Sequence, residues 1–338
     1  MKTLICKSPG EFGYEERNIP VPGPGEILLK MKMLGICGTD YHAFDGTQPF
    51  FEYPRILGHE IAAEIADAPK GSRFKTGDLV TVSPYFSCGK CIACRRGKTN
   101  CCTDINVFGV HIDGAMQEYI SVPSSAVVPG SGLTADELAL VEPLAIGAHG
   151  VGLAQITEND TVLILGAGPI GLGVISFVRA KGGKIIVSDV NENRLDFCKD
   201  KLGITHLINP LRTDPLAEVR KITGGDMATV IIDCTGNLNA INNALQFLAH
   251  SGKFIMIGLQ KGIIQIMHPE FHKREAMLMS SRNALPEDFD NVIRCIKEGL
   301  IRPLDLISHR IPFDNVKANF DPLSHTDQSL IKALIIFN

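Results

Sequence analysis

Apolar and polar residues alternate along the first part of the chain, and this pattern changes near residue 145. Residues 26–33 (EILLKMKM) alternate as the two faces of a half-buried strand do. Glycine, proline and cysteine recur throughout this part, and stretches with helical periodicity are scarce. We therefore expect a first segment that is rich in strands and turns.

Beyond residue 145, short apolar runs alternate with stretches of helical periodicity. The predicted strands are 162–165, 184–188, 230–233 and 254–258, and the predicted helices are 170–180, 191–203 and 238–248. This alternation predicts a parallel sheet covered by helices on both faces. After residue 282 the pattern gives a helix that starts near Pro286 and ends at Gly299, followed by a strand in the last residues, 330–338.

The chain has 338 residues, too many for one ordinary core, and this length suits two domains. Its net charge of −4 provides no bulk positive field to hold nucleic acid or an anionic membrane. The first apolar run, Leu4–Cys6, is too short for a secretion signal. The longest apolar run, 162–178, contains several glycines and Pro169, so it predicts a strand, a turn and a helix instead of a membrane span. We expect a cytoplasmic protein that binds neither membranes nor nucleic acid.

A glycine-rich turn, GAGPIG at residues 166–171, directly follows the first strand of the second part and opens a helix. Gly166 permits a tight turn, Gly168 lets a pyrophosphate approach the backbone, and Gly171 allows close packing of the helix. Asp189, at the end of the next strand, can accept hydrogen bonds from a ribose 2′-hydroxyl and would repel a 2′-phosphate. The pattern therefore favours NAD over NADP. The alternative is a glycine turn in a doubly wound sheet that binds nothing.

Five of the ten cysteines fall within 15 residues of the first part. Cys88, Cys91 and Cys94 are spaced evenly, and Cys101 and Cys102 follow. Without a secretion signal, such clustering favours a metal over disulfides. Four thiolates can close a tetrahedral zinc site that has no open position, which is a structural site. An iron–sulfur cluster and buried free thiols are the alternatives, and the chemistry alone does not decide between Cys101 and Cys102.

Four further candidate ligands lie near predicted turns of the first part. They are Cys37 in GICGTD, His59 and Glu60 in GHE, and Glu142 in VEP. Each alone has an ordinary explanation, because a single cysteine is usually a core residue and a single histidine is usually structural. Together they supply the sulfur, nitrogen and oxygen ligands that a catalytic zinc requires.

In combination, these motifs resemble the zinc-containing medium-chain dehydrogenase/reductase family. The matching segments are GICGTDYH (35–42), GHE (58–60), the cysteine-rich segment (88–102), VEPLA (141–145) and GAGPIGLG (166–173), so the resemblance runs over essentially the whole chain. Within the family the chain is similar to the sorbitol, threonine and sugar-acid dehydrogenase branch, and there to bacterial L-galactonate oxidoreductases and their starvation-sensing relatives. The segments that carry this finer resemblance are PFF (49–51), YPRILGHE (53–60), GVHIDG (109–114) and SSRNA (280–284).

The resemblance implies an α/β fold of two domains with the active site between them. A strand-rich GroES-like catalytic domain would comprise residues 1–145 and 283–338, and a doubly wound Rossmann domain, residues 146–282, would bind NAD. The resemblance also implies two zinc ions per chain. Catalytic zinc would be held by Cys37, His59 and Glu60, with Glu142 binding either directly or through water. Structural zinc would be held by Cys88, Cys91, Cys94 and Cys102, which leaves Cys101 spare.

The resemblance assigns further roles residue by residue. Thr39 and His42 match a proton relay, and Asp40 is placed to orient His59. Asp189 and Arg194 match the contacts to the adenosine ribose. The other positions that match the cofactor pocket are Gly166, Gly168, Pro169, Ile170, Gly171, Leu259, Arg282 and Asn283.

The activity implied by the resemblance is zinc-dependent transfer of a hydride between NAD and a secondary hydroxyl of a polyhydroxy acid such as L-galactonate. The substrate's carboxylate needs a cationic partner, for which His111, Lys273 and Arg282 are the candidates. A polyol or threonine-type dehydrogenase and a sensor without strong catalysis are the alternatives. A nucleic-acid-binding protein whose fold is stabilised by zinc is disfavoured by the net charge and by the lack of tryptophan. The branch also implies a homo-oligomer, either a dimer or a tetramer.

Overall fold

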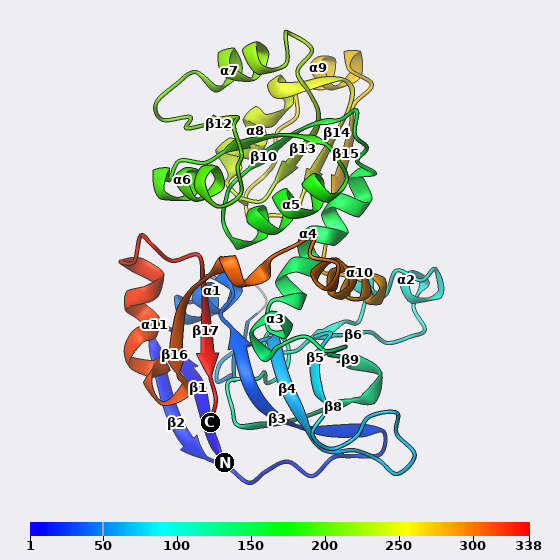
Figure 1. Cartoon of the computed structure of the whole chain (residues 1–338), viewed down its shortest axis with the longest axis vertical. Helices are drawn as coiled ribbons and strands as arrows, with labels where there is room; N and C mark the ends of the chain where they lie inside the picture. The colour runs from blue at the N-terminus through cyan, green and yellow to red at the C-terminus, as the bar shows by residue number, and fades with distance from the viewer. Residues whose placement is uncertain (49–50) are drawn as a thin grey trace. The chain divides into compact units, whose positions relative to one another are not determined.

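The computed structural model describes residues 1–48 and 51–338; Pro49 and Phe50, which belong to the PFF motif, lie outside the described residues. The described residues divide into two compact units (Figure 1). Unit 1 comprises Met1–Pro143, Ala284–Lys297 and Arg302–Asn338, and unit 2 comprises Leu144–Asn283 and Glu298–Ile301.

The main sheet of unit 1 has the strand order β16-β17-β3-β4-β5-β9, and β8 also pairs with β3. Its strands are β3 (Glu26–Gly35), β4 (Glu60–Asp67), β5 (Leu79–Val82), β8 (Tyr119–Pro123), β9 (Val127–Pro129), β16 (Ile307–Pro312) and β17 (Lys332–Ile336). The alternation predicted for residues 26–33 is confirmed, because Ile27, Leu29 and Met31 are buried and the side chains between them are more exposed. The last strand, red in Figure 1, lies beside the blue β3 and so brings C-terminal residues next to N-terminal ones.

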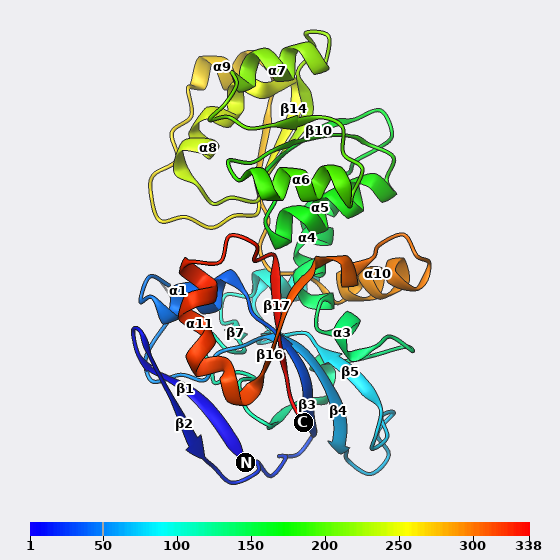
Figure 2. The same ribbon diagram turned by 60° about the vertical axis from the view of Figure 1, so that its left-hand side comes forward.

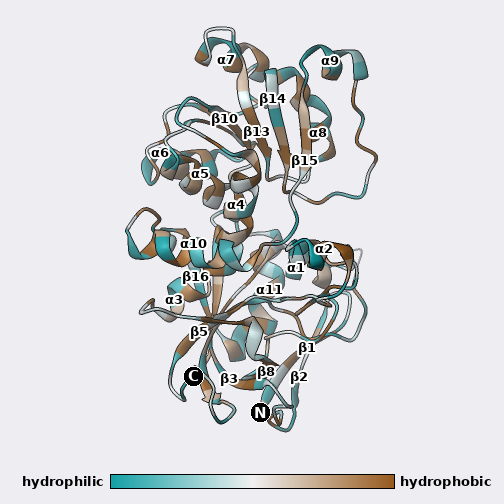
Figure 3. Ribbon diagram, turned by 90° about the vertical axis from the view of Figure 1, so that its right-hand side faces the viewer, coloured by the Kyte–Doolittle hydropathy of each residue, from teal (hydrophilic) through white to brown (hydrophobic). Residues whose placement is uncertain are grey.

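Smaller elements complete unit 1. Two short strand pairs join β1 (Lys2–Ser8) to β2 (Glu11–Glu16) and β6 (Tyr85–Phe86) to β7 (Asn106–Val107). The helices are α1 (Gly38–Phe44), α2 (Ile92–Arg95), η1 (Thr99–Cys101), η2 (Ser124–Ala126), α3 (Ala135–Leu138), α10 (Pro286–Lys297), η4 (Pro303–Leu306), η5 (Phe313–Asn315) and α11 (Val316–His325). Helix α10 starts at the predicted Pro286; its apolar side is buried, and its outer surface is largely teal in Figure 3. Helix α4 (Val141–Ala154) begins in unit 1 and continues in unit 2.

Unit 2 is a doubly wound sheet in the order β12-β11-β10-β13-β14-β15, with neighbouring strands parallel, as the sequence predicts. Its strands are β10 (Thr161–Leu165), β11 (Lys184–Ser188), β12 (Leu207–Ile208), β13 (Ala228–Asp233), β14 (Leu248–Met256) and β15 (Met277–Ser280). Its helices are α5 (Pro169–Ala180), α6 (Glu192–Asp200), α7 (Pro215–Ile222), α8 (Leu238–Asn243), η3 (Ala244–Phe247) and α9 (His268–Lys273). The chain winds from β10 to β12 and then from β13 to β15 in the opposite direction, so right-handed crossovers put α5 and α6 on one face and α8 and α9 on the other (Figure 2).

One element of unit 2 differs from its prediction. Helix α8 ends at Asn243, and strand β14 begins at Leu248, where the sequence pattern predicts a helix up to residue 248 and a strand only from residue 254. The sequence HSG at 250–252 has the composition of a turn, and Ser251 does adopt a left-handed φ of 61°. The sheet accommodates this irregularity by a shift of register between Ala228 and Val230 in the pairing of β13 with β14. The strand therefore continues through a local bulge.

Within the described parts of the chain, the helices are either too short or too polar to cross a membrane.

Candidate active site

Cys37, His59 and Glu60 come together in unit 1, and we call these three residues the catalytic cluster. Their sulfur, nitrogen and oxygen ligand atoms all lie within 4.8 Å of one another. Cys37 is the N-cap residue of α1, Glu60 is the first residue of β4, and His59 directly precedes that strand. His59 and Glu60 are 6% and 0% exposed. A thiol, an imidazole and a carboxylate at this spacing form a donor set that suits zinc.

Asp40 fixes the backbone around the catalytic cluster. Its Oδ2 accepts a hydrogen bond from the backbone N–H of Cys37 at 2.8 Å, and its Oδ1 accepts one from the backbone N–H of Gly58 at 3.1 Å. The Nδ1 of His59 lies 3.9 Å from Asp40 Oδ1, beyond hydrogen-bond distance, and has no partner among the described residues. Asp40 therefore acts on the cluster through the backbone on either side of it, without a direct hydrogen bond to His59.

Acidic side chains outnumber basic ones around the catalytic cluster, where Asp40, Glu60 and Glu142 are all buried. Burial raises the pKa of the carboxyl groups of Asp40 and Glu142. Burial alone would lower the pKa of His59, but the neighbouring Cys37 and Asp40 outweigh burial and raise that pKa well above its usual value. A divalent cation held among these groups would offset the charge and use the available donors. The residues present therefore fit a zinc ion.

Glu60 makes a buried ion pair that the sequence analysis did not find. The Nζ of Lys332, in β17, donates to both carboxylate oxygens of Glu60 at 2.6 and 2.8 Å and to the carbonyl of Ile36 at 3.1 Å. The Glu60 side chain reaches Lys332 across Gly35, the residue that pairs with Glu60 in the sheet. A Cβ at Gly35 would collide with the Glu60 carboxylate and lie 2.9 Å from the Glu60 Cβ. Glycine is therefore required at position 35 for this arrangement.

Glu142 lies in the first turn of α4, is 3% exposed and is not part of the group of ligand atoms formed by the catalytic cluster. Its Oε1 accepts a hydrogen bond from the hydroxyl of Tyr85. Tyr85 precedes the cysteine-rich segment, and the sequence pattern does not indicate a role for it either. No motif marks it, because the contact is between residues far apart in the chain.

Thr39 and His42, the predicted relay residues, share helix α1 and lie on one side of it because they are three positions apart. Thr39 is half-buried and His42 is exposed, which is the order that a path from the cluster to solvent requires. The Nδ1 of His42 lies 2.9 Å from the hydroxyl of Thr47.

The cysteine-rich segment, residues 88–102, which we call the cysteine lobe, brings four thiols together. The Sγ atoms of Cys88, Cys91, Cys94 and Cys102 all lie within 4.8 Å of one another, and Cys101 is exposed. Backbone N–H groups point at the sulfurs: Cys102 Sγ accepts from the N–H of Cys88 at 3.2 Å. Hydrogen bonds to its sulfur, above all from the backbone N–H of Cys94, lower the pKa of the Cys91 thiol to about 5. A lowered pKa favours the thiolate, which is the form that binds metal. The lobe has the donors of a closed structural zinc site.

The glycine motif of unit 2 forms the turn between β10 and α5. Gly166 has a φ of 93°, and a Cβ there would lie 2.8 Å from Thr235. A Cβ at Gly171 would collide with the carbonyl oxygen of Gly166. At Gly168, the N-cap of α5, a Cβ would meet its nearest neighbour, Arg194, at 3.8 Å, and no side chain caps the helix. The helix N-terminus is thus open to an anionic group.

Asp189 is buried beside this turn. Its Oδ2 accepts from the backbone N–H of Ala167 at 2.6 Å and its Oδ1 accepts from the backbone N–H of Asn191 at 2.8 Å. Arg194 Nη1 lies 3.8 Å from Asp189 Oδ2. Each carboxylate oxygen has a second lone pair, so Asp189 is held in place and can still accept ribose hydroxyls. The remaining predicted cofactor residues, Pro169, Ile170, Leu259, Arg282 and Asn283, also belong to unit 2.

The candidate partners for a substrate carboxylate, His111, Lys273 and Arg282, all make other contacts in the structure. His111, in unit 1, accepts a hydrogen bond at Nδ1 from the backbone N–H of Val107 at 2.9 Å. Lys273 forms an ion pair with Glu270 on its own helix, α9, at 2.8 Å.

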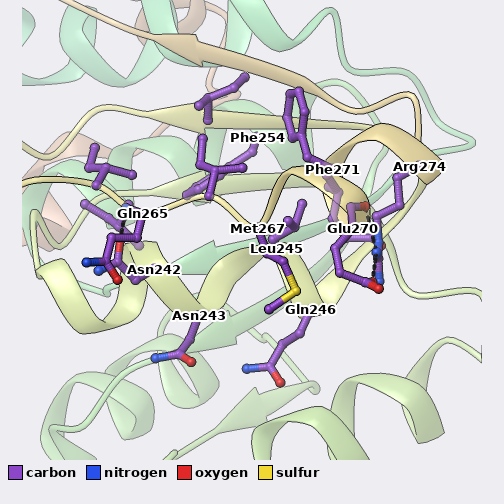
Figure 4. A pocket seen from close by; sticks show the side chains of 15 residues that line it. Asn242, Asn243, Leu245, Gln246, Phe254, Gln265, Met267, Glu270, Phe271 and Arg274 are labelled. Carbon is purple, nitrogen blue, oxygen red and sulfur yellow. Dashed lines mark hydrogen bonds and ion pairs between the residues drawn. The ribbon is translucent and has the colours of Figure 1, made fainter.

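A separate hollow in unit 2 is lined mainly by apolar side chains of α8, η3, β14 and α9 (Figure 4). Arg274 and Glu270, at one end of it, form an ion pair at 2.6 Å. None of the sequence-predicted site residues lines this hollow, so it is distinct from both the metal ligands and the glycine turn.

Comparison with known proteins agrees with this geometry. Residues 23–132 match the alcohol dehydrogenase GroES-like domain, and residues 169–298 match the zinc-binding dehydrogenase domain. L-galactonate-5-dehydrogenase of Escherichia coli (strain K12) is 44% identical over 338 residues, which cover 100% of this chain and 99% of the relative. Starvation-sensing protein RspB of the same strain is 34% identical over 100% of both chains. A crystal structure of RspB from E. coli CFT073, complexed with NADH, has a TM-score of 0.93 and 32% identity and covers 100% of this chain and 99% of its own.

Proposed function

The chain belongs to the zinc-binding alcohol dehydrogenases, and on this basis we propose that it oxidises a secondary hydroxyl of a polyhydroxy acid of the L-galactonate type with NAD. The observation that carries the proposal is the set of sulfur, nitrogen and oxygen donors of the half-buried Cys37 and the buried His59 and Glu60, all within 4.8 Å of one another. The sugar-acid substrate class is supported by the 44% identity to L-galactonate-5-dehydrogenase over the whole chain.

The catalytic cluster would hold zinc, with Glu142 beside it. Bound there, zinc supplies a Lewis acid that lowers the pKa of a substrate hydroxyl and stabilises negative charge on its oxygen. Asp40 keeps the backbone of Cys37 and Gly58 in position for this through its two hydrogen bonds. Lys332 holds the Glu60 carboxylate against the backbone of Gly35 in β3.

Thr39 and His42 would move the proton released from the substrate hydroxyl. A half-buried threonine hydroxyl can accept a proton from the substrate while passing its own outward, and the exposed His42 can deliver a proton to water. The hydroxyl of Thr47 holds the His42 ring at Nδ1, which leaves Nε2 for this exchange.

NAD would bind to unit 2 with its pyrophosphate at the N-terminus of α5 and its adenosine ribose at Asp189. Because backbone N–H groups already fix both oxygens of Asp189, the carboxylate needs no reorganisation to accept the ribose hydroxyls. Bound there, NAD would supply the acceptor for a hydride from the substrate carbon.

The donor set also bears on the substrate. Cys37, His59 and a glutamate bring less thiolate to the metal than the two cysteines of simple alcohol dehydrogenases. A site rich in carboxylate oxygens suits a substrate that offers a second hydroxyl, so a vicinal diol should be preferred to ethanol. His111, Lys273 and Arg282 are our candidates for contact with the substrate's carboxylate.

The test is kcat/KM, measured as NADH formation, for L-galactonate and other hexonates against the corresponding neutral alditols. Loss of a charge-assisted hydrogen bond to the carboxylate should cost about 1.5–3 kcal/mol, or roughly tenfold to a hundredfold in kcat/KM. Equal rates on sorbitol and the hexonates would instead make the protein a plain polyol dehydrogenase. Turnover of L-threonine alone would place it with the threonine dehydrogenases, and no turnover in the whole panel would favour a sensor.

We further propose that the protein forms a dimer or tetramer in the cytoplasm. Its mass in solution, measured by light scattering, and its distribution on cell fractionation test these two points.

A further inference from the structure

Tyr85 has no place in any motif, yet its hydroxyl contacts one of the acidic groups of the active site. We propose that Tyr85 is a positioning residue that fixes the orientation of the Glu142 carboxylate and directs its other oxygen, Oε2, to the metal. This inference rests on the proposed function, since it takes the catalytic cluster as the site of zinc.

The contact joins two distant parts of unit 1. Tyr85 stands in β6, and Glu142 stands in the first turn of α4. The Tyr85 hydroxyl donates to Oε1 of Glu142, and that carboxylate is almost completely buried. Water therefore cannot readily replace the tyrosine as the donor, so the hydrogen bond decides how the carboxylate is turned.

The ring of Tyr85 is held independently of its hydroxyl. Strand β6 pairs with β7, where Tyr85 is opposite Val107. The ring also packs edge-on against Phe289 of α10, with centroids 6.4 Å apart and planes at 70°. Replacing Tyr85 by phenylalanine therefore keeps the packing and removes only the donor.

A fixed Glu142 has a specific consequence for the metal site. The catalytic cluster supplies three donors within 4.8 Å, and Glu142 is outside that group. With one lone pair of Oε1 taken by the Tyr85 hydroxyl, Oε2 is the stronger donor of the two oxygens, so the tyrosine favours binding of Glu142 through Oε2. Residues that orient metal ligands in this way typically change metal affinity or activity by about 10- to 100-fold when they are replaced.

The experiment compares Tyr85→Phe, Glu142→Ala and the double variant, all as the zinc-loaded full chain. The affinity of the more weakly held zinc is measured by competition with a chelator, and the visible spectrum is recorded after cobalt replaces that metal. Tyr14→Phe is the matched control, because its hydroxyl donates to the backbone carbonyl of Phe313 at 2.5 Å in the same unit. Thermal unfolding of each variant reports on the fold.

We expect Tyr85→Phe to change the affinity of the cluster for zinc about 10- to 100-fold and to shift the cobalt spectrum, with little change in the unfolding temperature. Tyr14→Phe should leave both metal readouts unchanged. In the Glu142→Ala background, Tyr85→Phe should have no further effect, because Tyr85 acts through Glu142.

Two results would overturn the inference, and they are distinguishable. If Glu142→Ala alters the metal readouts and Tyr85→Phe behaves like Tyr14→Phe, the role of Tyr85 is wrong and the proposed function stands. If the wild-type chain holds no chelatable zinc at the cluster, the inference falls together with the proposed function.

Discussion

Replacing Lys332 by methionine would leave Glu60 as a buried carboxylate without its counterion. The structure sets the size of the effect. Lys332 donates to both oxygens of Glu60 at 2.6 and 2.8 Å, and the two side chains are only 4% and 1% exposed. Removing one partner of such a buried pair costs about 3–5 kcal/mol in the free energy of unfolding. We expect the lower end of this range in the zinc-loaded protein, because the metal offsets part of the charge on Glu60.

The assay is urea unfolding of the zinc-loaded wild type, Lys332→Met, Glu60→Gln and the double variant. The double variant should recover most of the loss, because a neutral glutamine needs no counterion. Lys273→Met is the control: it removes a lysine from an ion pair of similar length, 2.8 Å, whose side chains are 52% and 37% exposed. An exposed pair of this kind contributes about 0–1 kcal/mol. If Lys332→Met cost no more than this control, or if the double variant were no more stable than Lys332→Met, the buried pair would not contribute to stability in this way.

The remaining predictions concern the metals, the cofactor and pH. Mild chelation should remove the metal of the catalytic cluster first and abolish turnover without unfolding the protein. Cys88→Ser should instead lower the free energy of unfolding. An unchanged free energy of unfolding in Cys88→Ser would contradict a structural role for the cysteine lobe. Asp189→Ala should lower kcat/KM for NAD by about tenfold to a hundredfold and should reduce the ratio of kcat/KM for NAD to that for NADP. A wild-type protein that prefers NADP would refute the role given to Asp189. Burial alone would raise the pKa of Asp160, but hydrogen bonds from Thr157 and Thr229 outweigh it and lower that pKa. Ionised Asp160 therefore stabilises the fold above the unfolded pKa of about 4, and this contribution is lost as pH falls. Asp160→Asn should destabilise the protein at pH 7 and do so progressively less below pH 4. An equal loss of stability at pH 7 and below pH 4 would contradict this.

The sequence predicts the parts of this protein whose signals are local. The alternation in β3, the glycine turn with Asp189, and the spacing of the cysteines each lie within a short segment, and each appears in the structure in the expected place. Strand β14 shows the limit of local signals. The residues around Ser251 have the composition of a turn, yet they belong to the strand because it pairs with β13 on both sides of them.

The contacts that the sequence does not predict are those between distant segments. Lys332 stands in an apolar final strand, and a lysine in that setting signals that a buried acid must lie nearby. Its partner, Glu60, could not be identified until β17 was found next to β3. Gly35 and Tyr85 carry no signal by themselves, since their importance comes from the side chains of Glu60 and Glu142 that the fold places against them.

Whether the zinc of the catalytic cluster is catalytic is tested by the rate of NADH formation from L-galactonate before and after this zinc is removed and then restored. We predict that the rate falls to background when this zinc is removed, returns when zinc is added back, and stays at background in Cys37→Ser. Full turnover by the chain that lacks this zinc, or by Cys37→Ser, would show that Cys37, His59 and Glu60 do not form a catalytic zinc site.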